Sequence, residues 1–415
     1  MLIQFSFKNF KSFKNEVLLD MTATSIKEHP YNLIEMDNGN KYLKLAAIYG
    51  GNASGKSNVI EAFRFMSYLV MNSLSLEKEE NRHIKTTIPI RNFIFDNESK
   101  TKSSEFEVFF IYKNTEYQYG FVVDKDRVHA EWLYSKTPKG KKYDTLFERS
   151  GDVVRCGTKM ENAIKFKDSV DEKTLFLSLT AKTKIKQSKA VYEWFSENFI
   201  IDFGDINFER FISRAIPAEI LKDEEYKRKL EEFLFAIDTG ISGIRVEKIG
   251  KSKEDEHEIY QLYSQHVVNE KGDLKEIPFD QESSGTIKMF CLFDFFFDAL
   301  KKGNILFIDE LNAKLHPLLV RYIINMFHDS SINKNNAQLV FTTHDVFSLT
   351  KDTFRRDEVW FTQKDQLGIS KLFSLVEYKL EDNSKVRSDA TYYKDYTSGR
   401  YGAIPLLKEF SIWEG

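Results

Sequence analysis

One eight-residue stretch constrains this chain more than any other: residues 50–57 read GGNASGKS. They match the pattern G-x-x-x-x-G-K-[ST], in which glycines let the backbone curl and point its N–H groups at a bound phosphate. The apolar run Leu45–Tyr49 precedes the loop, and residues 58–70 follow it with apolar side chains near one helical face. The sequence therefore predicts a buried strand, a phosphate-binding loop and a helix, in that order.

Each position of the loop has an expected task in binding a nucleotide. Lys56 would bridge the β- and γ-phosphates, and the hydroxyl of Ser57 would bind Mg²⁺. The helix that begins near Gly55 would add the positive end of its dipole. The other positions expected to contact the nucleotide are Gly50, Gly51, Asn52, Ala53, Ser54 and Asn58. ATP and Mg²⁺ are therefore the expected ligands.

A second apolar run, Ile305–Ile308, ends in two carboxylates, Asp309 and Glu310. A buried strand beside the phosphate loop would place both side chains at the carboxyl edge of the sheet. Asp309 would hold Mg²⁺ through water, and Glu310 would orient and deprotonate the attacking water. Because many strands end in acidic residues, this assignment depends on the complete phosphate loop upstream.

A third apolar run, Leu339–Thr342, is followed by a histidine, His344. At the same edge of the sheet, His344 would contact the γ-phosphate and help to hold the attacking water. A histidine after a strand is more commonly a surface or capping residue. The position of His344 after Asp309 and Glu310 in the chain favours the catalytic interpretation.

The overall charge argues against a chain built mainly to bind nucleic acid. The 415 residues include 60 Lys and Arg against 63 Asp and Glu, a formal net charge of −3, whereas tight non-specific binding needs a basic excess. The lysines between Lys182 and Lys189 are interpreted as a solvated surface segment. The two cysteines, Cys156 and Cys291, stand alone and suit a reducing compartment, and no apolar run is long enough to span a membrane. We expect a cytoplasmic protein with no membrane partner.

Hydrophobic periodicity predicts an α/β fold. Between residues 93 and 155, a period-two alternation indicates four strands of a β-meander. Residues 160–240 read as mostly helical, with the clearest apolar stripe over Asp223–Ile237. Downstream, strands and helices alternate, as expected of a sheet with helices on its faces. Heptads do not run for three or four repeats, so long coiled-coil arms are not expected.

The order of these features resembles the head of an ABC/SMC-type ATPase: phosphate loop, β-meander, helical stretch, residues 280–286 (DQESSGT), Asp-Glu strand and histidine. Within that class the chain is similar to bacterial abortive-infection and anti-phage ATPases, the overcoming-lysogenisation-defect-like group of PARIS, Septu and RloA-type systems. The resemblance extends from Ile3–Phe13 to the tail segment Arg400–Pro405. The domains that it implies are an N-terminal ATPase lobe with phosphate loop and meander (1–160), a helical insert (161–243) and a C-terminal ATPase lobe (244–415).

By the same resemblance, Glu282–Thr286 takes the place of the ABC signature LSGGQ, from which it departs at its first, third and fifth residues. Ser283 and Gly285 would then meet the γ-phosphate bound to the other subunit, through a hydroxyl, a backbone N–H and a helix N-terminus. From the residues alone, Ser283 also reads as an ordinary helix N-cap.

Two further positions follow from the resemblance. Leu311–Pro317 takes the place of the D-loop, which crosses the dimer interface in the family. Within it, His316 either couples the subunits or starts the next helix, and Pro317 suits a first helical turn. Gln118 is a candidate for the glutamine of the Q-loop.

The resemblance implies a regulatory ATPase of an anti-phage system. ATP would close a homodimer or a higher homo-oligomer, and hydrolysis would reopen it. The ATPase would control a separate toxin or nuclease subunit, because the sequence after His344 shows no nuclease pattern of its own. Two alternatives stay open: an SMC-like DNA-repair ATPase that binds DNA, and a scaffold that senses nucleotide without hydrolysing it. A transporter subunit is disfavoured because the signature diverges.

Overall fold

The computed structural model describes residues 1–78, 87–138, 140–203, 217, 219–238, 240–251, 258–379, 386–387 and 390–404. Pro405, the last residue of the tail segment singled out in the sequence, lies outside these residues. Among the helices of the described ranges, none combines the length and the apolar character needed to cross a bilayer.

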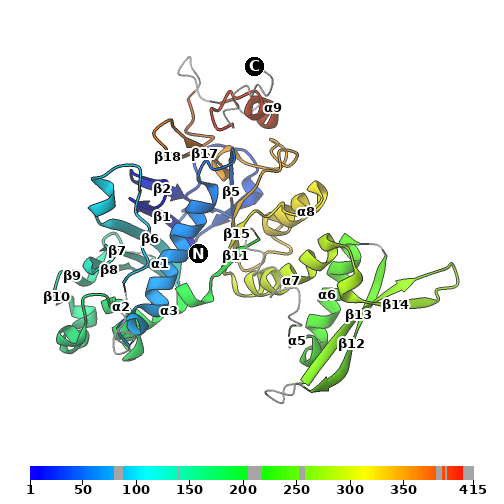
Figure 1. The fold of residues 1–415 in the computed structure, drawn as a ribbon, viewed down its shortest axis with the longest axis horizontal. Helices are drawn as coiled ribbons and strands as arrows, with labels where there is room; N and C mark the ends of the chain where they lie inside the picture. The colour runs from blue at the N-terminus through cyan, green and yellow to red at the C-terminus, as the bar shows by residue number, and fades with distance from the viewer. Residues whose placement is uncertain are drawn as a thin grey trace, which may run out of the picture.

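A mixed sheet in the order β11-β15-β16-β5-β17-β18 forms the centre of the molecule (Figure 1). Its strands are β5 (Leu45–Gly50), β11 (Phe199–Asp202), β15 (Ile305–Asp309), β16 (Gln338–Thr342), β17 (Val359–Lys364) and β18 (Ser370–Ser374). All neighbouring pairs are parallel except β17 and β18. The bounds of β5, β15 and β16 agree closely with the apolar runs read from the sequence, and the predicted α/β fold class is confirmed.

Both faces of this sheet are buried, which explains the continuous apolar runs. In β15, Ile305 and Phe307 belong to one hydrophobic cluster, whereas Leu306 and Ile308 belong to another, as the period-two geometry of a strand requires. The first cluster includes helix α1 (Lys56–Lys78), whose Phe63 stacks on Phe307 with ring centroids 4.1 Å apart. The second includes α7 (Ser284–Lys302) and α8 (Pro317–His328). The phosphate-loop helix and the helices of the C-terminal half therefore cover opposite faces.

A seven-stranded antiparallel sheet packs beside α1, in the order β10-β9-β8-β7-β6-β1-β2. Its strands are β1 (Leu2–Lys8), β2 (Val17–Asp20), β6 (Ser104–Tyr112), β7 (Thr115–Val123), β8 (Val128–Lys136), β9 (Asp144–Ser150) and β10 (Val153–Cys156). The four predicted strands of the meander are present, and β10 extends it. A small hairpin, β3 (Leu33–Glu35) and β4 (Lys41–Leu43), precedes β5.

The segment predicted as mostly helical contains one strand that periodicity missed. It includes a 3₁₀ segment over Thr158–Ser169 and the helices α2 (Phe176–Lys182), α3 (Lys186–Glu197), α5 (Glu219–Lys222) and α6 (Glu224–Ile237). Between α3 and α5, β11 joins the edge of the central sheet beside β15. Four residues in the middle of a helical pattern are too few for periodicity to reveal, and only pairing with β15 makes them a strand.

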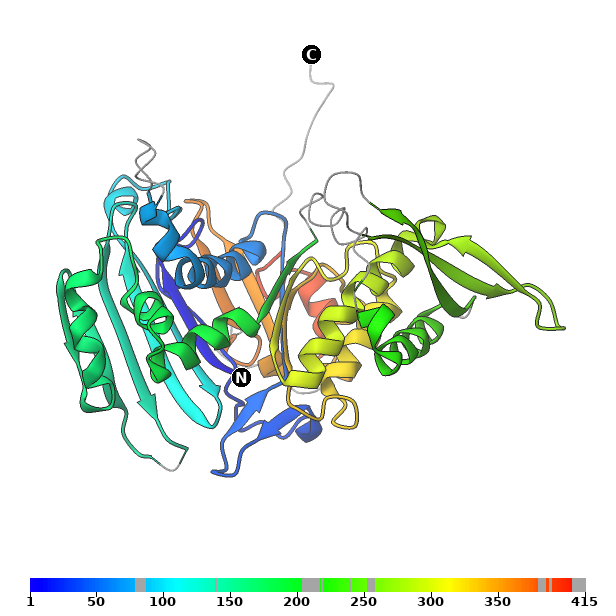
Figure 2. The ribbon, with the colours of Figure 1, turned by 90° about the horizontal axis from the view of Figure 1, so that it is seen from below.

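A separate three-stranded sheet follows α6 and projects from the end of the molecule opposite the meander (Figure 2). It consists of β12 (Ile241–Lys251), β13 (Glu258–Val267) and β14 (Leu274–Pro278). Helix α7 begins six residues after β14 ends, so this sheet lies beside the start of α7. Helix α9 (Tyr392–Thr397), the last one within the described ranges, lies near β17 (Figure 1).

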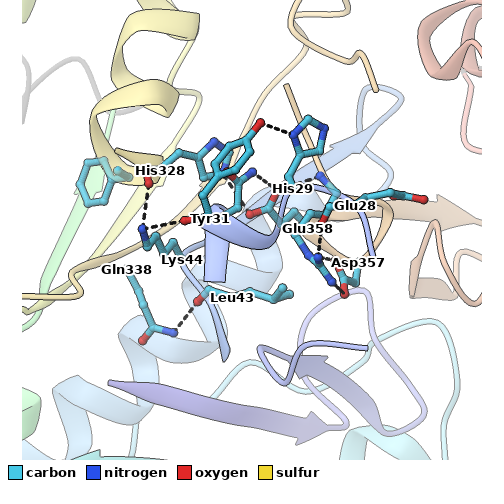
Figure 3. A network of polar contacts seen from close by, with 12 residues as sticks. Glu28, His29, Tyr31, Leu43, Lys44, His328, Gln338, Asp357 and Glu358 are labelled. Carbon is cyan, nitrogen blue, oxygen red and sulfur yellow. Dashed lines mark hydrogen bonds and ion pairs between the residues drawn. The ribbon is translucent and has the colours of Figure 1, made fainter. Parts of the chain in front are cut away.

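A buried polar network ties together the amino ends of the central strands (Figure 3). Lys44, just before β5, donates to the carbonyls of Tyr31 and His328 at 3.1 and 2.8 Å and to the Ser330 hydroxyl at 2.9 Å. His328 in turn donates to Glu358, just before β17, at 2.9 Å. The network thus closes the end of the sheet that lies opposite the phosphate loop.

Candidate nucleotide-binding site

The phosphate loop joins β5, which ends at Gly50, to α1, which begins at Lys56. A Cβ atom at Gly50 would stand 2.4 Å from Oγ1 of Thr362, so only glycine fits there. Gly55 adopts φ +114°, and a Cβ there would lie 2.7 Å from Oγ of Ser370. These positions therefore need glycine for two physical reasons, close approach and backbone conformation.

The side chains of the loop are divided between the interior and the surface. Asn52 and Ala53 are exposed at the loop tip, and Ala53 adopts φ +60°. Ser54 is buried and shares a 2.6 Å hydrogen bond with Thr362. Asn58 donates its amide to Ser12 at 2.8 Å, so its side chain is held by the protein.

Lys56 is buried, and its ammonium donates to the carbonyls of Gly50 and Gly51 at 3.0 and 3.1 Å. Burial lowers the pKa of Lys56 to about 8, and the carboxylates of Asp309 and Glu310 oppose that shift. The cation is therefore held inside the curled loop, close to the acidic end of β15. An anionic phosphate in the loop would give it the counter-charge that burial demands.

Asp309 ends β15 as a buried carboxylate. Burial raises its pKa, while hydrogen bonds from Thr342 and Ser57 act in the opposite direction. The Ser57–Asp309 contact joins the residue after the loop lysine to the strand-end acid. A hydroxyl and a carboxylate are the oxygen donors that Mg²⁺ takes from proteins when water and phosphate oxygens complete its octahedron. The residues present therefore fit a magnesium ion, which would be held by Ser57 and Asp309.

Glu310 follows in a left-handed conformation, with φ +54°, which costs a non-glycine residue energy unless the surroundings impose it. Its N–H donates to Oγ1 of Thr342 at 2.8 Å, and the same hydroxyl donates to Asp309. Thr342, at the end of β16, thus fixes both acidic residues. Sequence reasoning missed this threonine, because only the pairing of β15 with β16 brings it there.

His344 lies two residues beyond β16 and is exposed. Partial burial and the nearby Lys56 lower its pKa, and Asp309 opposes the shift. The imidazole is therefore neutral at pH 7. The backbone N–H of His344 donates to Oδ1 of Asn312 at 3.0 Å, and the hydroxyl of Thr343 donates to the same oxygen at 3.0 Å. The charges of Asp309 and Glu310 act on Lys56, and those of Lys56 and Asp309 act on His344. These residues therefore lie at the same edge of the sheet.

Ser283 and Gly285 occupy a different place, at the start of α7. Ser283 is the N-cap, and its hydroxyl accepts from the N–H of Thr286 at 3.1 Å. The capping interpretation is therefore confirmed. Ser283 is exposed, and the first N–H groups of α7, at Ser284 and Gly285, have no acceptor within their own helix. The hydrogen bonds of Ser283 run to Thr286 rather than to residues 50–58.

Two residues that distinguish this segment from LSGGQ are held by the protein itself. Glu282 accepts from His266 of β13 at 2.7 Å, which ties the segment to the three-stranded sheet. The hydroxyl of Thr286 donates to Asp238, just after α6, at 3.0 Å. The divergence therefore has a structural reason, since these side chains anchor α7 to neighbouring elements.

The structure resolves two further predictions. Gln118 lies in the middle of β7 and donates to Glu107 at 2.8 Å, so its side chain belongs to the meander and the Q-loop prediction is wrong. Meander strands alternate their side chains between two faces, and position 118 faces Glu107. His316 is the N-cap of α8, with Nδ1 accepting from the N–H of Leu318 at 3.2 Å, which confirms the helix-start interpretation.

Two other parts of the chain reach the site without a signal in the sequence. Asp202 ends β11 directly opposite Asp309 in the parallel register, and its charge raises the pKa of Asp309. From the tail, the carbonyl of Ala403 accepts from the N–H of Gly51 at 2.9 Å, and Tyr401 is buried against Phe361. The tail segment therefore supports the phosphate loop, which explains its conspicuous aromatic and glycine residues.

The family described as "AAA domain, putative AbiEii toxin, Type IV TA system" matches residues 45–350, which begin with β5 and end beyond His344. The chain belongs to this family. The match of the AAA-domain family includes every residue of the site except Ser12 and the C-terminal elements that support the loop. A search of curated proteins returned no match.

Two of the solved structures that resemble this AAA-domain family member illustrate how distant the likeness is. One is described as "Crystal structure of the SmcHead bound to the C-winged helix domain of ScpA", with 14% identity, a TM-score of 0.41, and coverage of 93% of this chain and 99% of that chain. The other is described as "Structure of the recombination mediator protein RecF-ATPrS in RecFOR pathway", with 14% identity, a TM-score of 0.32, and coverage of 90% and 98%.

Proposed function

We propose that this protein hydrolyses ATP at a site completed by a second copy of itself. The strongest support for this proposal is that the predicted site residues lie in two different places. Lys56, Asp309, Glu310 and His344 gather at one edge of the central sheet, whereas Ser283 caps a separate exposed helix end. A nucleotide bound at the loop of one subunit would meet the α7 N-terminus of the other, as the ABC/SMC resemblance implies.

In this mechanism the phosphate loop binds the β- and γ-phosphates through its backbone, and Lys56 neutralises their charge. Mg²⁺, when bound to Ser57 and Asp309, would supply charge neutralisation at the same oxygens. Glu310 accepts a proton from the attacking water and holds it in line with the γ-phosphate. His344, whose pKa is lowered in the nucleotide-free protein by partial burial and by Lys56, donates a hydrogen bond to the γ-phosphate.

The partner's α7 would complete the site. Its N-terminus presents two N–H groups without intrahelical acceptors and the positive end of a helix dipole, both suited to a phosphate oxygen. Because ATP is then bound by both subunits, binding favours the closed dimer, and loss of the γ-phosphate favours its opening.

We further propose that opening and closing control a separate toxin or nuclease subunit of an abortive-infection system. The description of the family names a putative toxin and a toxin–antitoxin system, and the order of motifs resembles defence ATPases. Dimer closure would change the surface offered to that subunit, so that ATP turnover sets its activity.

The test measures ATP hydrolysis and particle mass together for wild type, Glu310→Gln and Ser283→Arg. Glu310→Gln should lose turnover by roughly 100-fold or more but form an ATP-dependent dimer. Ser283→Arg should be inactive and stay monomeric, because a long cation blocks the α7 N-terminus. Ser196→Arg, on the exposed end of α3, is the matched control and should behave as wild type.

Two outcomes separate the alternatives for the ATP site. If ATP binds and closes a dimer but wild type shows no turnover, the nucleotide-sensing scaffold is correct and hydrolysis is wrong. If Ser283→Arg hydrolyses ATP as a monomer, the site is complete within one chain.

For the effector, we would express the chain with its genomic neighbours and challenge the cells with phage. Protection lost in Glu310→Gln and kept in Ser196→Arg supports control by turnover, whereas equal protection in both contradicts it.

A further inference from the structure

A buried lysine in α7, Lys288, contacts the segment that begins with Glu310. Its side chain is 3% exposed. The ammonium donates to the carbonyls of Ala313 at 2.6 Å, Leu311 at 3.0 Å and Glu310 at 3.5 Å. It also lies 3.8 Å from the ring centroid of Phe203, just beyond β11, a cation–π distance. The lysine therefore joins α7 to three carbonyls of one short loop.

That loop, residues 310–314, determines where the proposed general base points. Glu310 has φ +54° and Lys314 has φ +60°, so the loop both begins and ends in a left-handed conformation that needs outside support. Asn312, in its middle, accepts from the hydroxyl of Thr343 and from the N–H of His344. A displacement of the loop would thus move Glu310 and His344 together.

The same helix carries the proposed contact with the partner's nucleotide. Ser283 caps α7, and Lys288 lies in its second turn. At Gly285 the helix approaches the loop so closely that a Cβ would lie 3.3 Å from the carbonyl of Lys314. A shift of the α7 N-terminus would therefore move the loop in two ways, through the close approach at Gly285 and through the hydrogen bonds of Lys288.

We propose that Lys288 is a positioning residue that couples the N-terminus of α7 to Glu310. When the partner's nucleotide docks on Ser283, the ammonium of Lys288 transmits the change in α7 to the loop carbonyls and sets Glu310 for hydrolysis. The inference rests on the proposed function, and it adds a route by which one subunit senses the nucleotide of the other.

A lysine suits this role because its charge cannot stay buried without partners. An ammonium has three donors, and each must find an acceptor in the interior. Here the acceptors are carbonyls of the loop, so α7 and the loop are fixed to each other as long as the charge is satisfied. An apolar residue of similar length would fill the space but leave the two elements free to move separately.

The first experiment tests the contact itself, without ATP. Lys288→Met is compared with Lys302→Met, whose lysine lies at the other end of α7 and pairs with Asp298 on the surface. Hydrogen exchange is followed at the loop N–H groups of Leu311 and Ala313, which donate to Thr342 and Glu310. Exchange should rise at least about tenfold in Lys288→Met alone. Unchanged exchange in Lys288→Met would overturn the inference, whatever the ATPase activity.

The second experiment separates positioning from general stability. In Lys288→Met, kcat should fall at least about tenfold while KM for ATP stays within about twofold, because the phosphate loop is intact. Lys288→Arg, which keeps the charge, should recover part of kcat. If Lys288→Met does not fold, Lys288→Gln, which loses the charge but stays polar, replaces it in both experiments. Turnover equal to wild type in Lys288→Met, or a fall in kcat that Lys302→Met shares, would contradict the coupling. A wild type without turnover would instead contradict the proposed function.

Discussion

Two buried lysines flank the same strand, β5, and they are held in different ways. Lys44 precedes the strand and donates to two carbonyls and one hydroxyl supplied by distant segments. Lys56 follows the strand and donates to two carbonyls of its own loop. Burial lowers the pKa of both. At one end of β5, the ammonium of Lys44 completes a buried hydrogen-bond network. At the other end, the ammonium of Lys56 lies close enough to Asp309 and Glu310 for their charges to act on it.

The difference shows how the same residue serves structure or ligand binding. An ammonium has three donors, and those of Lys44 all end on atoms of the fold (Figure 3). The contacts of Lys56 are with carbonyls of its own glycine loop, which a bound phosphate could replace as partners of the ammonium. A ligand is therefore expected to change the surroundings of Lys56 and to leave those of Lys44 unchanged. The three predictions below test this contrast.

The largest effect is expected for Lys56→Met. Loss of the only loop cation should weaken ATP binding by at least about 100-fold, or roughly 3 kcal/mol. The nucleotide-free protein should melt at the same temperature or higher, because the substitution removes a buried charge. Calorimetric titration with ATP and a thermal melt measure both quantities. ATP binding equal to wild type would mean that the loop is not a nucleotide site.

The opposite result is expected for Lys44→Met. The substitution leaves the carbonyls of Tyr31 and His328 without their donor, which should lower the free energy of unfolding by about 2 kcal/mol. Affinity for ATP should stay within about twofold of wild type, since the phosphate loop lies at the other end of β5. Denaturant titration measures the free energy of unfolding, and calorimetric titration measures the affinity for ATP. If ATP affinity fell as far as stability, the two ends of the strand would not be independent.

The smallest expected effect is a pH dependence that belongs to Lys56 alone. The free protein has Lys56 with a pKa of about 8, and a bound phosphate raises that pKa, so binding favours the protonated lysine. Affinity for ATP without Mg²⁺ should be nearly constant below pH 8 and fall by about tenfold per pH unit above it. Lys56→Met should show no such fall, whereas Lys44→Met should keep it. A flat profile in wild type would contradict the buried cation.

Lys56 also makes the free energy of unfolding depend on pH. The pKa of Lys56 is lower in the folded protein than its ordinary value of 10.5. The unfolded chain therefore binds more protons between pH 8 and 10.5, and this residue's contribution to stability rises with pH across that window. The destabilising contribution is fully present below pH 8, where an anionic ligand would offset it.

Local patterns predicted the parts of the site that are continuous in the chain. The strand, glycine loop and helix over β5 and α1 follow from apolar runs and from backbone angles that only glycine adopts. The β15 strand with Asp309 and Glu310 was predicted for the same reason. The sequence left two interpretations of Ser283, a signature residue that contacts a partner's nucleotide and an ordinary helix N-cap. The structure confirms the cap, and the contact with a partner's nucleotide remains a prediction.

Other parts could not be predicted because no local pattern marks them. β11 consists of four residues that become a strand only beside β15. Gln118 was chosen for its residue type, but the alternation of β7 turns it toward Glu107. Thr342 was not chosen at all, although its hydroxyl contacts both acidic residues. In each case the decisive neighbour is distant in the chain.

The sequence by itself determined the phosphate loop, the strand-end acids and the α/β class, because these depend on periodicity and backbone geometry over a few residues. Only the tertiary structure decided which buried lysine is available to a ligand and which is closed. Lys44 meets His328, 284 residues away, and Lys288 meets Leu311, 23 residues away. Burial and hydrogen bonding depend on what surrounds a side chain in space, and that is settled when the sheets and helices pack together.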